Sequence, residues 1–146
     1  MKKLACIFLS TLVVSTAIAA DAYICVPDHV TGFKFEGGEW KPSIFNTDNK
    51  KYIIRRSKES DLHGTAYPWI WGELGDERPV GICKETFSKI SVTNCLGLGT
   101  DLQISSKTLR FQETNTYGYV FDGFNDGDIP DSSNTPFIMI GKCSEI

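Results

Sequence analysis

Four cysteines constrain the fold of this chain more than any other feature of its sequence: Cys25, Cys83, Cys95 and Cys143. The fifth cysteine, Cys6, lies in an N-terminal segment that we expect to be removed. The even number that remains indicates disulfides, and four cysteines allow three pairings between which the sequence does not decide. We favour Cys25 with Cys143, because the ends of a compact domain usually lie close together. We also favour Cys83 with Cys95, because their separation of twelve residues suits a hairpin of two medium-length strands.

The first twenty residues have the organisation of a secretory signal peptide. Two lysines precede an uncharged, mostly apolar run from residue 4 to residue 18, and small residues follow it at Ala19 and Ala20. The apolar run is shorter than the roughly 20 residues that span the hydrocarbon core of a bilayer. We therefore expect cleavage after Ala19 or Ala20, a signal peptide over 1–20 and a mature chain over 21–146.

The mature chain is acidic and has the length of one domain. Lys2 and Lys3 account for two of the 15 basic residues, so 13 remain against 18 acidic ones, a net charge of about −5. The largest local group of basic residues comprises Lys50, Lys51, Arg55, Arg56 and Lys58. Side chains alternate along a strand, so this group divides between two faces. We therefore expect a single β domain in the periplasm or outside the cell, with no nucleic-acid partner and no membrane span.

Short runs of β-branched and aromatic residues recur between Gly, Asn, Asp and Pro, which is typical of antiparallel β structure. The clearest hairpin has Phe33 and Phe35 before a Gly37-Gly38 turn and Trp40 after it. Further strands are expected over 52–56, 67–71, 80–84, 90–95, 102–104, 109–111, 117–122 and 137–140. This spacing predicts an all-β fold of about eight strands, a small antiparallel barrel braced by two disulfides, with a β-sandwich as the alternative.

The segment with the strongest binding character holds Tyr67, Trp69 and Trp71. On a strand these three rings share one face. They could fill the core, line a pocket for an apolar or sugar-like ligand, or anchor a protein partner. Pro68 cannot donate to a ladder, which predicts that this strand lies at an edge or carries a bulge.

Two other groups of residues have side chains suited to chemistry. A hydrolase could use Asp61 and His63 with a neighbouring serine, Ser57 or Ser60, although residues close in sequence rarely make such a site. A loose calcium site could use the acidic residues of one loop, namely Asp122, Asp126, Asp128 and Asp131. Zinc ligands in paired short spacings are absent from the sequence. We predict no catalytic residue, no metal and no cofactor.

Three stretches of the chain form one pattern: Cys25 with Gly32-Phe33 and Trp40, then Leu109-Arg110-Phe111 with Gly118-Tyr119-Val120, then Thr135-Pro136 with Ile140-Gly141-Lys142-Cys143. This pattern resembles small exported proteins of unknown function that recur in proteobacteria. These motifs are turn glycines, core aromatics and disulfide cysteines. The resemblance implies export and one domain, and it carries no function over.

Three functional classes follow from these observations. The first is a non-enzymatic exported domain that binds another protein, in the manner of an inhibitor. The second is a carrier barrel for a small apolar ligand, held by the face of Tyr67, Trp69 and Trp71. The third is an enzyme whose active site has no recognisable spacing, and we expect it least.

Overall fold

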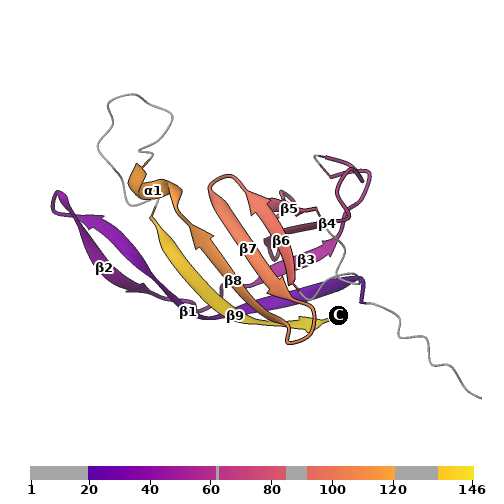
Figure 1. Cartoon of the computed structure of the whole chain (residues 1–146), viewed down its shortest axis with the longest axis horizontal. Coiled ribbons are helices and arrows are strands. Elements are labelled where there is room, and N and C mark those ends of the chain that lie inside the picture. The colour runs from indigo at the N-terminus through magenta and orange to yellow at the C-terminus, as the bar shows by residue number, and fades with distance from the viewer. Residues whose placement is uncertain (1–19, 62, 85–91, 121–134) are drawn as a thin grey trace, which may run out of the picture.

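A closed antiparallel barrel forms the core of the computed structural model, which describes residues 20–61, 63–84, 92–120 and 135–146. The predicted signal peptide falls, except for Ala20, on residues outside this description. The strands are β1 (Ala22–Glu36), β2 (Glu39–Phe45), β3 (Tyr52–Arg56), β4 (Trp69–Glu73), β5 (Gly81–Cys83), β6 (Val92–Gly97), β7 (Thr100–Ser105), β8 (Arg110–Asn115) and β9 (Phe137–Glu145). Eight of them close the barrel and β2 is additional (Figure 1), so the predicted barrel is confirmed and the sandwich is excluded.

The length of β1 allows it both to close the barrel and to extend beyond it. Its first residues, from Ala22 to Cys25, pair with β3, while its other edge pairs with β9 from Tyr23 to Gly32. Its last part pairs with β2 through the predicted hairpin, where Gly37 and Gly38 have φ of 64° and 86°. These positive φ values suit glycine and give the tight turn. The β1–β2 hairpin therefore projects from one end of the barrel (Figure 1).

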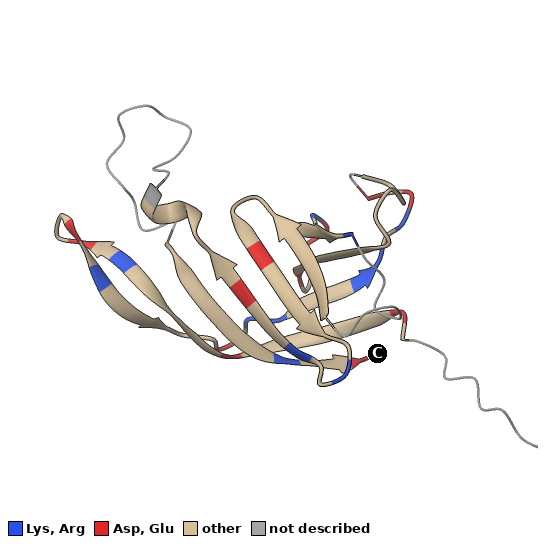
Figure 2. Cartoon of the chain, in the orientation of Figure 1, with Lys and Arg blue, Asp and Glu red and all other residues tan. Residues whose placement is uncertain are grey.

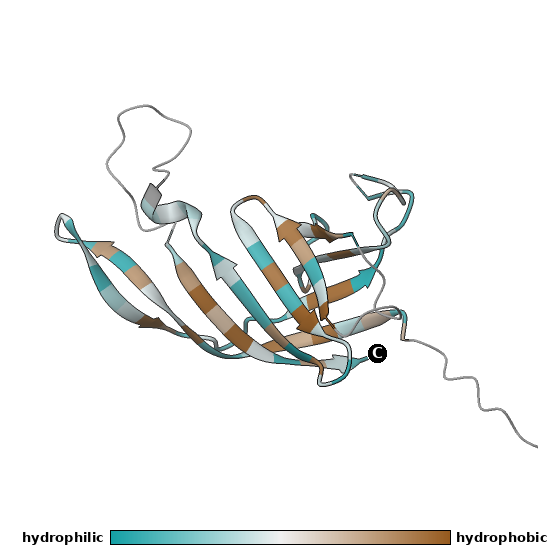
Figure 3. Cartoon of the chain, in the orientation of Figure 1, coloured by the Kyte–Doolittle hydropathy of each residue, from teal (hydrophilic) through white to brown (hydrophobic). Residues whose placement is uncertain are grey.

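Alternation of side chains along the strands explains where the core lies. Buried and exposed residues alternate through β6, β7 and β8, as expected for strands with one face inward. The same alternation of apolar and polar residues is visible along the strands in Figure 3. The inward side chains form one cluster of buried residues, among which Ile54, Trp69, Trp71 and Ile104 are almost fully enclosed.

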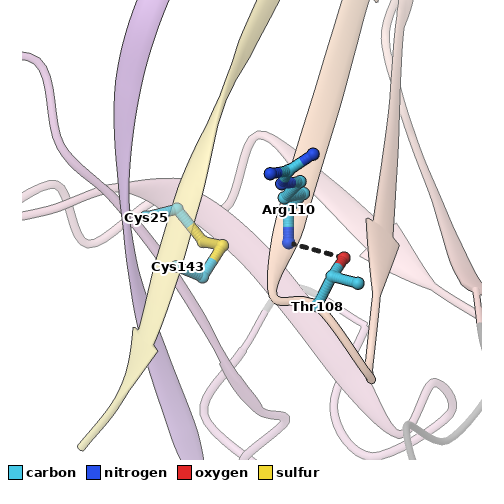
Figure 4. The surroundings of a disulfide bond; sticks show 4 residues. All are labelled: Cys25, Thr108, Arg110 and Cys143. Atoms are coloured by element: carbon cyan, nitrogen blue, oxygen red, sulfur yellow. Dashed lines mark hydrogen bonds between the residues drawn. A yellow bond between two sulfur atoms is a disulfide. The ribbon is translucent and has the colours of Figure 1, made fainter.

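Both predicted disulfides are confirmed. Cys25 lies opposite Cys143 in the β1–β9 pair, and Cys83 lies opposite Cys95 in the β5–β6 pair. All four sulfur-bearing side chains are buried in the barrel. Figure 4 shows the first disulfide joining β1 to β9. It thus fastens the first strand to the last at the seam where the barrel closes, near Arg110, whose backbone N–H donates to Thr108 Oγ1 at 3.4 Å.

Two sequence-based expectations were wrong. Residues Tyr117–Val120 form a short helix, α1, instead of the beginning of a strand over 117–122; the rest of that segment lies outside the described residues. The Asn115 Oδ1 accepts a hydrogen bond from the Tyr117 N–H at 3.1 Å, and this Asx turn leads from β8 into the helix. The strand β4 is not at an edge, because β3 and β5 pair with it on both sides. Pro68 precedes its first residue and so removes no ladder hydrogen bond.

Charged residues mark the β1–β2 hairpin and several turns, and single acidic residues lie within β7 and β8 (Figure 2). On the hairpin, Lys34 and Glu36 lie 3.6 Å apart and Lys41 and Glu39 lie 3.1 Å apart, all of them exposed. Exposed pairs of this kind stabilise a fold little. Most charged residues in the described part of the chain lie outside the barrel, so a charged residue that is buried is unusual.

Candidate functional site

The two tryptophans singled out from the sequence lie inside the barrel. Trp69 and Trp71 share the inner face of β4 and are each 1% exposed. The ring of Tyr23 lies 5.8 Å from that of Trp69, and the ring of Tyr52 lies 6.0 Å from that of Trp71. Tyr67 lies before the first residue of β4, so it is not part of this row of inward-facing rings. Packed in this way, the two indoles present no surface to a protein partner.

Asp61 and His63, the residues that could form a hydrolase site, contact different partners in the structure. Arg55 donates two hydrogen bonds to the Asp61 carboxylate, at 2.7 and 3.0 Å, and the Lys58 N–H donates a third at 2.7 Å. The hydrogen bonds from Arg55 hold the pKa of Asp61 below its usual range. The exposed His63 instead packs its ring edge-on against Tyr67, with centroids 5.8 Å apart. Asp61 therefore stabilises the turn in which it lies.

The predicted calcium residues Asp122, Asp126, Asp128 and Asp131 lie outside the described part of the chain. Within that part, no three His, Cys, Asp or Glu residues are grouped so that they could hold a metal ion. The described residues therefore contain no group that could act as a metal site.

A cavity of about 780 Å³ lies at the end of the barrel from which the β1–β2 hairpin projects. Its volume falls within the range of small-molecule pockets, which extends from about 300 to about 1,000 Å³. The wall includes Val30, Tyr52, Glu73, Glu113, Phe137 and Met139. These side chains come from β1, β3, β4, β8 and β9, so closure of the barrel is what brings them together.

The floor of this cavity contains a buried carboxyl group. Glu113 lies on the inner face of β8 and is 3% exposed. Its neighbours across the sheet are the buried apolar side chains of Leu102 on β7 and Met139 on β9. Its Oε2 atom has no hydrogen-bond partner in the described part of the chain. Thr100, another cavity residue, likewise has a buried Oγ1 without a partner there.

Burial decides the ionisation of this carboxyl. The pKa of Glu113 is raised to about 7, mainly by burial and next by the negative charge of Glu73, while the positive charge of Lys50 acts in the opposite direction. Lys50 Nζ lies 2.8 Å from Glu73 Oε1, so these two residues form an ion pair with each other at the rim. Burial also raises the pKa of Tyr52, with the charges of Glu113 and Glu73 as the next causes. The floor therefore offers an acceptor that is about half ionised near neutral pH.

Glu113 is not among the candidate residues predicted from the sequence, although its position carries a signal. Phe111 and Glu113 are two residues apart in a run that becomes β8, so a strand that buries the first also buries the second. A charged residue at an inward position is uncommon unless it is paired. This pattern, more than the aromatic segment, indicated the site.

A second hollow, of about 550 Å³, lies beside the turn between β7 and β8. Its wall includes Asp28, Arg110 and Lys142, which are exposed, and Ile140 from the outer face of β9. None of the buried polar atoms that lack a partner among the described residues belongs to its wall. The cavity at Glu113 is therefore the stronger candidate.

No protein family, curated protein or solved structure matches this chain. The described residues include no helix with the length and apolar character that crossing a membrane would require. The two disulfides are compatible with an oxidising compartment.

Proposed function

We propose that this protein is an exported, non-enzymatic barrel that binds a small, partly apolar molecule in the cavity above Glu113. The observation that supports the proposal is Glu113, which belongs to the wall of a 780 Å³ cavity and whose buried Oε2 has no hydrogen-bond partner among the described residues. An unsatisfied buried polar atom costs about 1–3 kcal/mol. A ligand that supplies a hydrogen bond to this oxygen recovers that free energy on binding.

The rest of the wall suits an apolar ligand body. Val30, Phe137 and Met139 contribute apolar surface, and Tyr52 contributes an aromatic ring. Binding sites for small molecules typically combine such walls with a few placed polar groups. Phe45, which lies opposite Val30 in the β1–β2 pair, adds a further aromatic ring to this wall. The cavity therefore combines apolar wall residues with one buried carboxyl group, that of Glu113.

Filling the cavity tests this proposal. Val30→Phe places a larger side chain into the cavity, while Thr31→Phe places the same side chain on the outer face one residue later in β1. Titration with the neutral apolar dye N-phenyl-1-naphthylamine is expected to raise its fluorescence with the wild type and with Thr31→Phe. The affinity of Val30→Phe should fall at least about tenfold, which is about 1.4 kcal/mol. Equal binding by all three proteins, or none by the wild type, would contradict the proposal.

Export is supported by the signal-peptide pattern of residues 1–20 and by the two disulfides. Expression in a bacterium with separation of the cell fractions tests it directly. Intact mass of the exported protein should correspond to a chain that starts at Ala20 or Asp21 and has no free thiol. A full-length chain retained in the cytoplasm with titratable thiols would count against export.

A protein partner is the second candidate, favoured by one observation on the outer face. Ile44 and Ile138 lie on either side of Thr31 across the sheet, and Phe33 and Ile140 continue the same face. All four apolar side chains are between about half and almost fully exposed. If this surface binds a protein, Ile138→Asp should abolish a defined complex that Asn94→Asp, on the exposed face of the distant strand β6, preserves. If both variants lose the complex, or if neither does, this surface is not the binding site.

A further inference from the structure

The charges around Glu113 indicate which ligand chemistry the cavity would accept. The other titratable residues of the wall are Lys34, Lys50, Tyr52 and Glu73. Lys50 is paired with Glu73 at 2.8 Å, and the exposed Lys34 lies 3.6 Å from Glu36 on its own hairpin. The facing residues of β7 and β9, Leu102 and Met139, carry no charge. In the described part of the chain no cationic side chain forms a salt bridge with Glu113.

Resting on the function proposed above, we infer that the ligand is an amphipathic amine, whose ammonium group binds the Glu113 carboxylate while its apolar body packs on Val30, Phe137 and Met139. A buried carboxylate without a counterion is costly, and a cation within hydrogen-bond distance offsets part of that cost. An ammonium group donates several hydrogen bonds, so it also satisfies the unpaired Oε2. The aromatic ring of Tyr52 adds an electron-rich surface beside the anchor.

Anionic ligands fit this floor poorly. A carboxylate-bearing ligand would meet Glu113 and Glu73 on the same wall, and only Glu73 has a lysine partner. It could bind only with Glu113 protonated, so its affinity would fall as pH rises. An amine shows the opposite dependence, because it needs the ionised carboxylate. The sign of the pH dependence therefore separates the two classes of ligand.

Three ligands of equal chain length test the inference: octylamine, octanol and octanoate, each titrated by calorimetry into the mature, disulfide-bonded protein. Octylamine stays protonated to about pH 10, as lysine does. The ionised fraction of a carboxyl with a pKa of about 7 rises about tenfold between about pH 6 and about pH 8. We expect octylamine to bind most tightly and its affinity to rise about tenfold over this range. Octanol should show no such rise, and octanoate should bind most weakly.

Glu113→Gln keeps the shape of the side chain and removes its charge. In this variant octylamine should lose both its advantage over octanol and its dependence on pH. Gln112→Leu, on the outer face next to Glu113, should behave as the wild type. Thermal unfolding of both variants confirms that each is folded before titration.

The outcomes separate this inference from the proposed function. If N-phenyl-1-naphthylamine binds in the cavity but octanol or octanoate binds at least as tightly as octylamine, the cavity is a ligand site and the amine inference is wrong. An octylamine affinity that is unchanged in Glu113→Gln would also overturn it. If neither the dye nor any of the three ligands binds, the proposed function fails together with the inference.

Discussion

Glu113 on β8 lies directly opposite Met139 on β9, which places an ionisable carboxyl beside an almost fully buried thioether. The pairing has a consequence for stability. Burial raises the pKa of Glu113 to about 7 from an ordinary value of 4.5. Between these values the folded protein holds a proton that the unfolded chain has released. Stability is therefore highest below about pH 4.5 as far as this group is concerned, falls towards pH 7, and stays constant above it.

The first prediction measures this dependence in the absence of ligand. Urea unfolding should give the wild type a free energy of unfolding about 3 kcal/mol lower at about pH 8 than at about pH 4.5, from this group alone. Glu113→Gln should remove most of that difference. Glu39→Gln, an exposed glutamate on β2, should keep the wild-type dependence. If Glu113→Gln and the wild type respond equally to pH, the carboxyl is not buried as described.

The second prediction concerns Gly81, against which the Trp71 indole packs. A Cβ atom at Gly81 would collide with Trp71 Nε1 and with the carbonyl oxygen of Leu96. Because the first neighbour is a fully buried ring and the second is backbone, neither can move freely. Gly81→Ala should destabilise the barrel by about 1–3 kcal/mol, the usual cost of overpacking. Gly72→Ala, whose Cβ would have no neighbour closer than 3.3 Å, should cost less by the same unfolding measurement; equal costs would contradict this packing.

The third prediction compares the two disulfides. Cys25–Cys143 closes a loop with a sequence separation of 118, and Cys83–Cys95 one of 12. On the chain-entropy model the first restricts the unfolded chain more, by about 5 against about 3 kcal/mol. Replacing both cysteines of the long loop with serine should therefore lower the free energy of unfolding by about 2 kcal/mol more than the same change in the short loop. Chemical denaturation of the two double variants checks this, and the reverse order would mean that native contacts outweigh chain entropy.

The parts of the fold that were predictable from sequence depend on local patterns. The Gly37-Gly38 turn between Phe35 and Trp40 specifies a hairpin by backbone conformation alone, and it is present. The disulfide pairing of Cys83 with Cys95 followed from their separation, and that of Cys25 with Cys143 from the proximity of chain ends. Each of these inferences needs only a short stretch of chain or a general property of compact domains.

What could not be predicted depends on contacts between distant residues. Tyr117 lies in a segment whose residues alternate as in a strand, yet its ring packs against Gly99. A Cβ atom at Gly99 would collide with this ring. The position of Glu113 over Met139 depends on the register between β8 and β9, which no local pattern fixes. The cavity itself exists only because β1 closes against β9. Sequence periodicity identifies which residues face inward, but it does not show where the inward side chains leave space.

The last prediction concerns the ion pair between Arg55 and Asp61, which fixes the turn after β3. Arg55 donates to both oxygens of a carboxylate that is only 6% exposed, so Asp61→Asn should lower the free energy of unfolding by about 1–3 kcal/mol. Asp21 meets Arg56 at 2.8 Å but is 82% exposed, and Asp21→Asn should cost less than about 1 kcal/mol.

Because the hydrogen bonds from Arg55 lower the pKa of Asp61, this contribution to stability is present above the ordinary pKa of 3.8 and is lost as pH falls through the lowered value. Acid unfolding of Asp61→Asn should therefore lack a component that the wild type and Asp21→Asn share. An NMR titration in which Asp61 takes up its proton at or above the ordinary value would show that the pair does not form in solution, and the turn would then have to be held by its backbone hydrogen bonds alone.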